Sequence, residues 1–140
     1  MTLLLINSNQ LIMNRFFYTY TYSLLWALFI LCVCGMNGSY IPQIHFTDII
    51  QPDSLAHITL FGLQTWFIAT DRKRKSPSNG LSLRLIPPAF VISAMYGLII
   101  EVLQATVFIN RSYDYMDMAA NTLGCILASF VLFLKFKKTL

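Results

Sequence analysis

Charged residues are scarce in this chain of 140 residues. They make up 11% of the sequence, against about 25% in soluble domains, whereas apolar residues make up 56% and the mean hydropathy is +0.62. A soluble domain of this size must cover a large surface with polar groups. The composition therefore excludes an ordinary cytosolic domain and a disordered chain, and it predicts a small integral membrane protein.

Cysteine is scarce as well, which excludes a secreted disulfide scaffold. Of the three cysteines, Cys32 and Cys34 are two residues apart in a helical stretch and point to different sides. Cys125 lies in another apolar stretch. We expect all three to be buried small hydrophobic residues.

The sequence motifs of several common enzymes are absent. There is no G-x-S-x-G, no P-loop and no H-E-x-x-H, so the sequence offers no clear nucleophile. The net charge is +4, but the basic residues are segregated along the chain. That distribution indicates membrane topology rather than nucleic-acid binding.

Apolar stretches dominate what is present. Four of them are 17 to 21 residues long, which matches the ~20 helical residues that cross a hydrocarbon core. The sequence predicts an all-α polytopic membrane protein with a short segment at 1–15, a four-helix transmembrane domain over 16–134 and a basic tail at 135–140. The four predicted transmembrane helices cover residues 16–36, 54–70, 85–104 and 117–134. Met1 and Met13 are both conceivable translation starts.

The basic residues give the predicted orientation. Nine of the ten lie before the first span, between the second and third, or after the fourth. Positively charged loops stay in the cytoplasm, so both termini are predicted to be cytoplasmic. Only Arg111 remains on the outer side. The run at 72–75 is most simply a stop-transfer signal, although it also suits anionic lipid headgroups.

The acidic residues collect on the opposite side. Five of the six fall in or beside the outer loops, and only Asp71 is predicted to be cytoplasmic. Glu101 lies inside the third span, where a carboxylate is costly and therefore indicates function. The five outer acids are Asp48, Asp53, Glu101, Asp114 and Asp117.

Helical spacing places polar residues of three spans at one depth. Asp53 and His57 form an i,i+4 pair, as do Asp117 and Asn121. His57, Asn121 and Glu101 lie ~5–6 Å inside their helix ends, so the three should face one another or a wet cavity. Structural roles are the alternative: Asp53 and Asp117 as helix caps, and His57 with Gln64 as hydrogen-bonding partners between helices. Gly124 and Ala128 suit close helix packing.

Three short motifs follow one another in the second half of the chain. They are E-x-x-Q at 101–104, R-x-x-D-x-x-D at 111–117 and N-x-x-G at 121–124. Their order resembles the VanZ-like membrane protein family. An earlier D-x-x-x-H segment at 53–57 is similar to the family's D-K-x-x-H, with Ser54 in place of the Lys. The resemblance covers about residues 53–134, and the first span fits the family's leading helix.

The resemblance implies a multi-pass protein of the bacterial cytoplasmic membrane. The founding member of that family is associated with resistance to the lipoglycopeptide teicoplanin, an antibiotic, and many relatives occur without other resistance proteins. The site residues carried over by motif are Asp53, His57, Glu101, Gln104, Arg111, Asp114, Asp117 and Asn121, together with Gly124.

Two functions fit these residues. In the first, a non-enzymatic cell-envelope protein binds a polar lipid, a lipid-linked cell-wall intermediate or a lipoglycopeptide near the outer headgroups. Arg111 would offer a forked donor to phosphate or carboxylate, oriented by Asp117 or paired with Glu101. Gln104 and Asn121 would bond sugar or amide groups.

In the second function, a membrane-embedded enzyme acts on a lipid or envelope substrate. His57, Asp53 and Glu101 would be its acid–base groups. One histidine among carboxylates gives little support for a metal, so no metal and no cofactor is expected. Ion transport lacks a polar path through the cytoplasmic half. The expected partner is the lipid bilayer, with no nucleic acid, and the sequence leaves the oligomeric state open.

Overall fold

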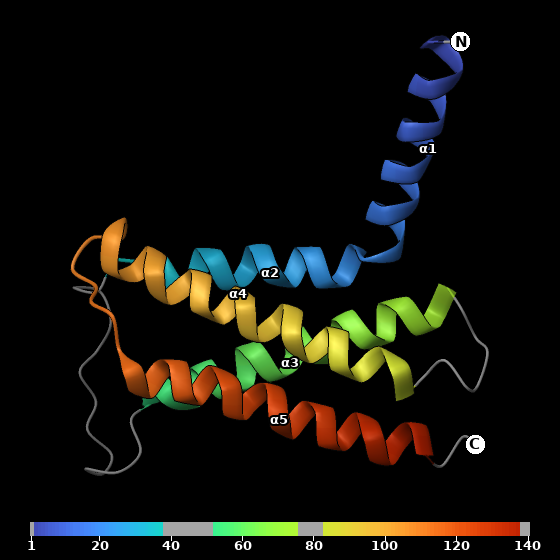
Figure 1. The fold of residues 1–140 in the computed structure, drawn as a ribbon. Coiled ribbons are helices and arrows are strands. Elements are labelled where there is room, and N and C mark those ends of the chain that lie inside the picture. Colours follow the sequence, from blue (N-terminus) through green and yellow to red (C-terminus); the bar gives the residue numbers. More distant parts are fainter. Residues whose placement is uncertain (1, 38–51, 76–82, 138–140) are drawn as a thin grey trace.

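The computed structural model describes residues 2–37, 52–75 and 83–137, and every regular element in these ranges is helical (Figure 1). The expected loop residues at 38–51 and 76–82, with Asp48 among them, and the tail at 138–140 lie outside the described residues. A 3₁₀ turn at Leu83–Leu85 precedes α4. The five α-helices are α1 (Thr2–Thr19), α2 (Thr21–Cys34), α3 (Pro52–Lys75), α4 (Ile86–Thr106) and α5 (Tyr115–Lys137).

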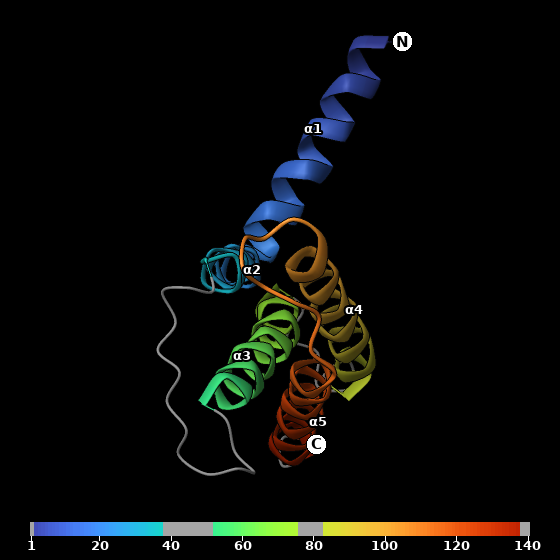
Figure 2. The same cartoon turned by 90° about the vertical axis from the view of Figure 1, so that its left-hand side faces the viewer.

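Helices α2 to α5 lie side by side as a bundle, and α3 has the other three around it (Figure 2). Its most extensive contact is with α5, followed by α4 and α2. Two apolar clusters fill the bundle. Ile30, Phe61 and Ile100 belong to one, whereas Ile68 and Leu132 belong to the other.

Helices α4 and α5 are long and apolar enough to cross a membrane. The spans found this way are Leu83–Thr106 and Tyr115–Lys137, and a third exists if the bent pair Gln10–Thr19 and Thr21–Cys34 counts as one. The chain is therefore a helical membrane protein. Helix α3 does not pass the same test, because buried polar residues such as His57, Gln64 and Thr65 lower its hydropathy. These side chains face other helices, so they do not meet lipid.

The first predicted span, 16–36, is wrong as a single helix. The chain breaks at Tyr20, and α1 and α2 meet at 73°. Thr19 and Thr21 on either side turn their hydroxyls back to the carbonyls of Arg15 and Phe17. Such back-bonding bends helices, and α1 projects away from the bundle (Figure 1).

The cysteines divide between the core and the surface. Cys34 and Cys125 are buried as predicted, but Cys32 is exposed, and all three are free thiols. The prediction for Cys32 was wrong because α2 contacts the bundle along one face only. Residues two positions apart on a helix point in nearly opposite directions. Cys34 therefore packs inward and Cys32 points outward.

Glycine gives the close contact between α3 and α5. A Cβ on Gly124 would overlap the backbone carbonyl of Ile58, and a Cβ on Gly62 would lie 3.2 Å from the Gly124 carbonyl oxygen. The helices therefore meet backbone to backbone at this level, as the small residues predicted. This contact sets the distance between the polar side chains that lie about one turn closer to the N-terminus of each helix.

Candidate functional site

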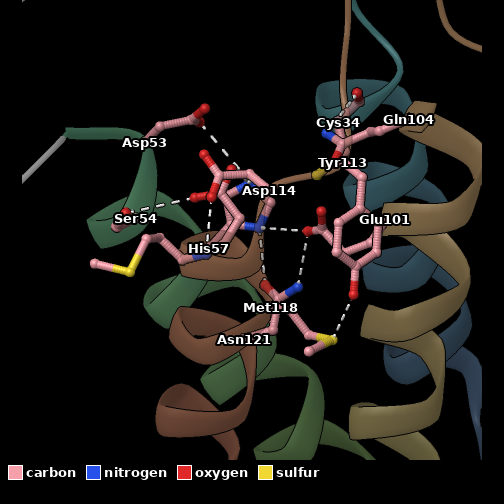
Figure 3. A network of polar contacts seen from close by, with 12 residues as sticks. Cys34, Asp53, Ser54, His57, Glu101, Gln104, Tyr113, Asp114, Met118 and Asn121 are labelled. Carbon is pink, nitrogen blue, oxygen red and sulfur yellow. Dashed lines mark hydrogen bonds and ion pairs between the residues drawn. The ribbon is translucent and has the colours of Figure 1, made fainter.

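Three helices carry polar side chains to one end of the bundle, which we call the acidic end (Figure 3). Asp53 and His57 come from the first two turns of α3, Glu101 from the last turns of α4, and Asp117 and Asn121 from the start of α5. These five residues form what we call the polar cluster. All except Asp53 are buried. The prediction that three helices bring polar side chains together at one level is thus met by these five residues.

A chain of hydrogen bonds links α3, α5 and α4 through this cluster. The Asn121 amide nitrogen donates to Glu101 Oε1 over 3.2 Å, and Asn121 Oδ1 lies 2.8 Å from His57 Nδ1 (Figure 3). A carboxylate only accepts, so the amide must turn its NH₂ to Glu101 and its oxygen to His57. His57 Nδ1 is then the donor, and its proton is fixed on the side facing Asn121.

The second ring nitrogen of His57 faces two carboxylates. His57 Nε2 lies 3.8 Å from Asp53 Oδ1 and 3.7 Å from Asp117 Oδ2. Both distances exceed hydrogen-bond length. Asp53, His57 and Asp117 each turn one potential metal-ligand atom into this space, and these atoms lie within 4.8 Å of one another.

Arg111 binds a different partner from the one the sequence suggested. Its Nη1 lies 3.3 Å from Asp53 Oδ2, so the ion pair joins the loop after α4 to the first turn of α3. The hypothesis that Arg111 pairs with Asp117 or Glu101 is wrong. Asp117 is already directed into the bundle, where Ser54 Oγ lies 3.4 Å from its Oδ1.

Two of the predicted site residues do other work. The Gln104 amide donates to the carbonyl of Cys34 over 3.2 Å, which satisfies a free carbonyl at the end of α2. Asp114 Oδ1 accepts the backbone N–H of Met116 over 2.7 Å and so caps α5. The cap expected of Asp117 is therefore supplied by Asp114, and Asp117 is left for the cluster.

Several contributors were not predicted. Ser54 bonds Asp117, and the Phe61 ring stacks on His57 at 13°. Gly97 of α4 leaves room for Asn121, whose Cβ would lie 3.2 Å from an added methyl group. The i+4 spacing of Phe61 from His57 was the one sequence signal for these contacts.

Two buried polar atoms at the acidic end have no hydrogen-bond partner among the described residues. They are Glu101 Oε2, on a fully buried side chain, and Arg111 Nε. Gln64 Oε1, deeper in the bundle, is a third such atom. Buried polar atoms are nearly always bonded, so these two atoms mark the acidic end as the place where a further partner would bind.

Comparison with known proteins gives one result. The sequence profile of the VanZ/LLP1 family matches residues 4–136, nearly the whole chain and well beyond the motif region at 53–134. Comparisons with curated proteins and with solved structures give no match.

Proposed function

The chain belongs to the VanZ/LLP1 family, and from this premise we propose that it binds a polar headgroup at the acidic end of its bundle. The headgroup belongs to a lipid, a lipid-linked cell-wall intermediate or a lipoglycopeptide. The protein is a multi-pass protein of the bacterial cytoplasmic membrane in this proposal. Binding of the headgroup would underlie tolerance to teicoplanin-type glycopeptides.

A four-span topology accompanies the proposal. In this topology the bent pair of α1 and α2 makes one crossing of the bilayer, α3, α4 and α5 make one each, and both termini lie in the cytoplasm. The charges of the two ends support this orientation, because Lys73, Arg74 and Lys135 lie together at the C-terminal ends of α3 and α5, opposite the polar cluster. We call this end of the bundle the basic end. Cytoplasmic ends are rich in Lys and Arg. The acidic end then faces the outer leaflet.

Two exposed positions test this orientation. Cysteine introduced as Ser112→Cys should react with a membrane-impermeant maleimide in intact cells, whereas Lys137→Cys should react only after the membrane is opened. Both variants need a Cys32→Ser background, because Cys32 is exposed. Equal labelling of the two positions in intact cells would contradict the four-span topology.

The observation that carries the binding proposal is the pair of unpartnered atoms, Glu101 Oε2 and Arg111 Nε. The buried carboxylate oxygen suits a hydroxyl or amide donor on the ligand. The guanidinium suits phosphate or carboxylate, to which Arg bonds with fixed geometry. A headgroup that combines a sugar or amide with an anionic group offers both partners.

Native mass spectrometry of the protein extracted with its membrane tests the proposal. We expect the wild-type protein to retain a specific lipid or lipid-linked species. Arg111→Ala and Glu101→Gln should lose it, and Asp114→Asn should keep it, because Asn still caps a helix. Identical retained lipids in all four proteins would overturn the binding site.

Enzymatic turnover of the same headgroup is the second candidate. The specific observation in its favour is His57, which donates through Nδ1 and turns Nε2 to two carboxylates. Such a ring can accept and release a proton at Nε2. A mass change in the retained species during incubation, absent in His57→Ala, would favour the enzyme with His57, Asp53 and Glu101 as acid–base groups.

A further inference from the structure

We propose that Asp53 Oδ1, His57 Nε2 and Asp117 Oδ2 bind one divalent transition-metal ion at the acidic end. Metal–nitrogen and metal–oxygen bonds of zinc are about 2.0–2.2 Å long, so one ion can hold two ligand atoms up to about 4.2 Å apart. The separations of 3.8 and 3.7 Å from His57 Nε2 to the two carboxylate oxygens fall within that limit. All three ligand atoms lie within 4.8 Å of one another, so Asp53 and Asp117 have to approach each other by at most about 0.6 Å to share one ion.

Each ligand also has a partner that fixes it from behind. Asn121 holds Nδ1 of His57, so the lone pair is on Nε2, which faces the carboxylates. Arg111 lies against Asp53 Oδ2, and Ser54 against Asp117 Oδ1, which leaves the opposite oxygen of each carboxylate for the shared space. Metal ligands are typically held by such outer hydrogen bonds.

The charge of the cluster points the same way. Asp53, Glu101 and Asp117 are three carboxylates around the His57 ring, and the Arg111 guanidinium pairs with Asp53. If all three are ionised, two negative charges are left without a partner of opposite charge. With neutral His57, one divalent ion cancels both charges. With Nε2 unprotonated and no metal ion, a nitrogen lone pair would face two carboxylate oxygens, an unfavourable arrangement.

Asp53 gives the ion an open side. Its side chain is 35% exposed, whereas His57 and Asp117 are 2% and 9% exposed. Three protein ligands with an open position are typical of sites that bind water or substrate on the metal. The ion would hold an anionic oxygen of the headgroup next to Arg111, and this role, unlike the metal binding, rests on the proposed function.

Metal binding by the purified protein tests the proposal without any lipid ligand. The full chain in lipid nanodiscs is stripped with EDTA and titrated with Zn²⁺ and, separately, with Mn²⁺, which is followed by electron paramagnetic resonance. We expect one ion per chain and a raised melting temperature. Asp53→Asn and Asp117→Asn should weaken binding at least about 100-fold, and Asn121→Ala about 10–100-fold.

Asp114→Asn is the matched control. It removes a carboxylate from the same end, keeps the helix cap, and should bind the ion as the wild type does. Asp53→Asn keeps the test valid if buried variants misfold, because the Asp53 side chain is partly exposed. Absence of a stoichiometric ion, or equal weakening by Asp114→Asn, would overturn the metal site. Metal binding without a retained lipid would overturn only the proposed function, and a retained lipid without metal would overturn only the metal site.

Discussion

The two ends of the bundle each bury a carboxylate, and they treat it differently. At the basic end, Asp71 is 3% exposed, and its Oδ2 accepts the backbone N–H of Ser23 at 2.9 Å and the Ser23 hydroxyl at 2.8 Å. At the acidic end, Glu101 is fully buried, with one oxygen bonded to Asn121 and the other unpartnered. Asp71 is a structural acid that satisfies the start of α2. Glu101 is the acid that can still accept a hydrogen bond, at Oε2.

The cations at the two ends also differ. Lys73 lies 4.3 Å from the centre of the Phe136 ring, Arg74 4.8 Å from Tyr22 and Lys135 4.6 Å from Trp66. These side chains cover aromatic rings at the rim of the bundle, which suits a membrane surface. Arg111 at the acidic end instead pairs with Asp53. Burial of charge alone therefore does not mark a site, and the partners of each charge separate the two ends.

Gly124→Ala should have the largest effect on stability, because it disrupts the close contact between α3 and α5, the two helices that run from the acidic end to the basic end. The added methyl group would meet the Ile58 backbone, which cannot move aside as a side chain can. We expect a loss of about 3 kcal/mol of unfolding free energy, the upper part of the range for overpacking. Thermal unfolding in detergent measures it.

Gly97→Ala is the comparison for that variant. Its new methyl group would meet Asn121 and Phe61 side chains at 3.2 and 3.3 Å, so the loss should be smaller while the polar cluster is disturbed. Equal stability of the Gly124→Ala and wild-type proteins would mean that α3 and α5 are further apart than the structure has them.

Asp71→Ala should destabilise the protein without affecting the acidic end. It leaves the Ser23 N–H and hydroxyl buried without their acceptor, and an unsatisfied buried group costs about 1–3 kcal/mol. We expect a loss near 2 kcal/mol together with retained ligand. Loss of the ligand in a protein that still folds would show that the two ends are coupled.

The sequence predicted much of this difference, but not all of it. Long apolar stretches and the i,i+4 pairs Asp53–His57 and Asp117–Asn121 were enough to predict α3 to α5 and the polar cluster, because helical spacing dictates which side chains share a face. The role of Asp71 was missed. Its partner Ser23 is 48 residues away, and local spacing carries no information on such a contact.

Loop and helix-end geometry limited the remaining predictions. Arg111 pairs with Asp53 because the loop after α4 crosses to the start of α3, and sequence distance to Asp117 suggested otherwise. Asp114 and Asp117 both suit an N-cap, and only the backbone determines which one accepts the free N–H. The break at Tyr20 was likewise hidden inside an uninterrupted uncharged stretch.

A double-mutant cycle on Arg111 tests the ion pair that the structure adds. Arg111→Ala and Asp53→Ala should be coupled by about 0.5–1 kcal/mol, the value for a partly exposed pair. Arg111→Ala and Asp117→Ala should be additive within about 0.5 kcal/mol. Thermal unfolding of the single and double variants gives both values. Stronger coupling of Arg111 with Asp117 would restore the pairing that the sequence suggested.

Glu101→Gln should have the smallest effect on stability and the clearest effect on function. Gln keeps the size of Glu and an oxygen that accepts from Asn121, and Oε2 has no partner to lose. We expect unfolding free energy within about 0.5 kcal/mol of the wild type, since removing an unpaired buried charge offsets any weakened bond. The amide would, however, present a donor where the ligand needs an acceptor.

Teicoplanin susceptibility of a host that depends on this protein should therefore rise to that of a strain lacking the protein. Membrane levels of the variant are checked by blot. Asp71→Asn makes the same chemical change at the basic end, where both bonds of the carboxylate are charge-assisted. It should lower stability by about 1 kcal/mol and keep protection against teicoplanin.

If Glu101→Gln and Asp71→Asn both kept protection, the polar cluster would have a structural role at the acidic end, as Asp71 has at the basic end.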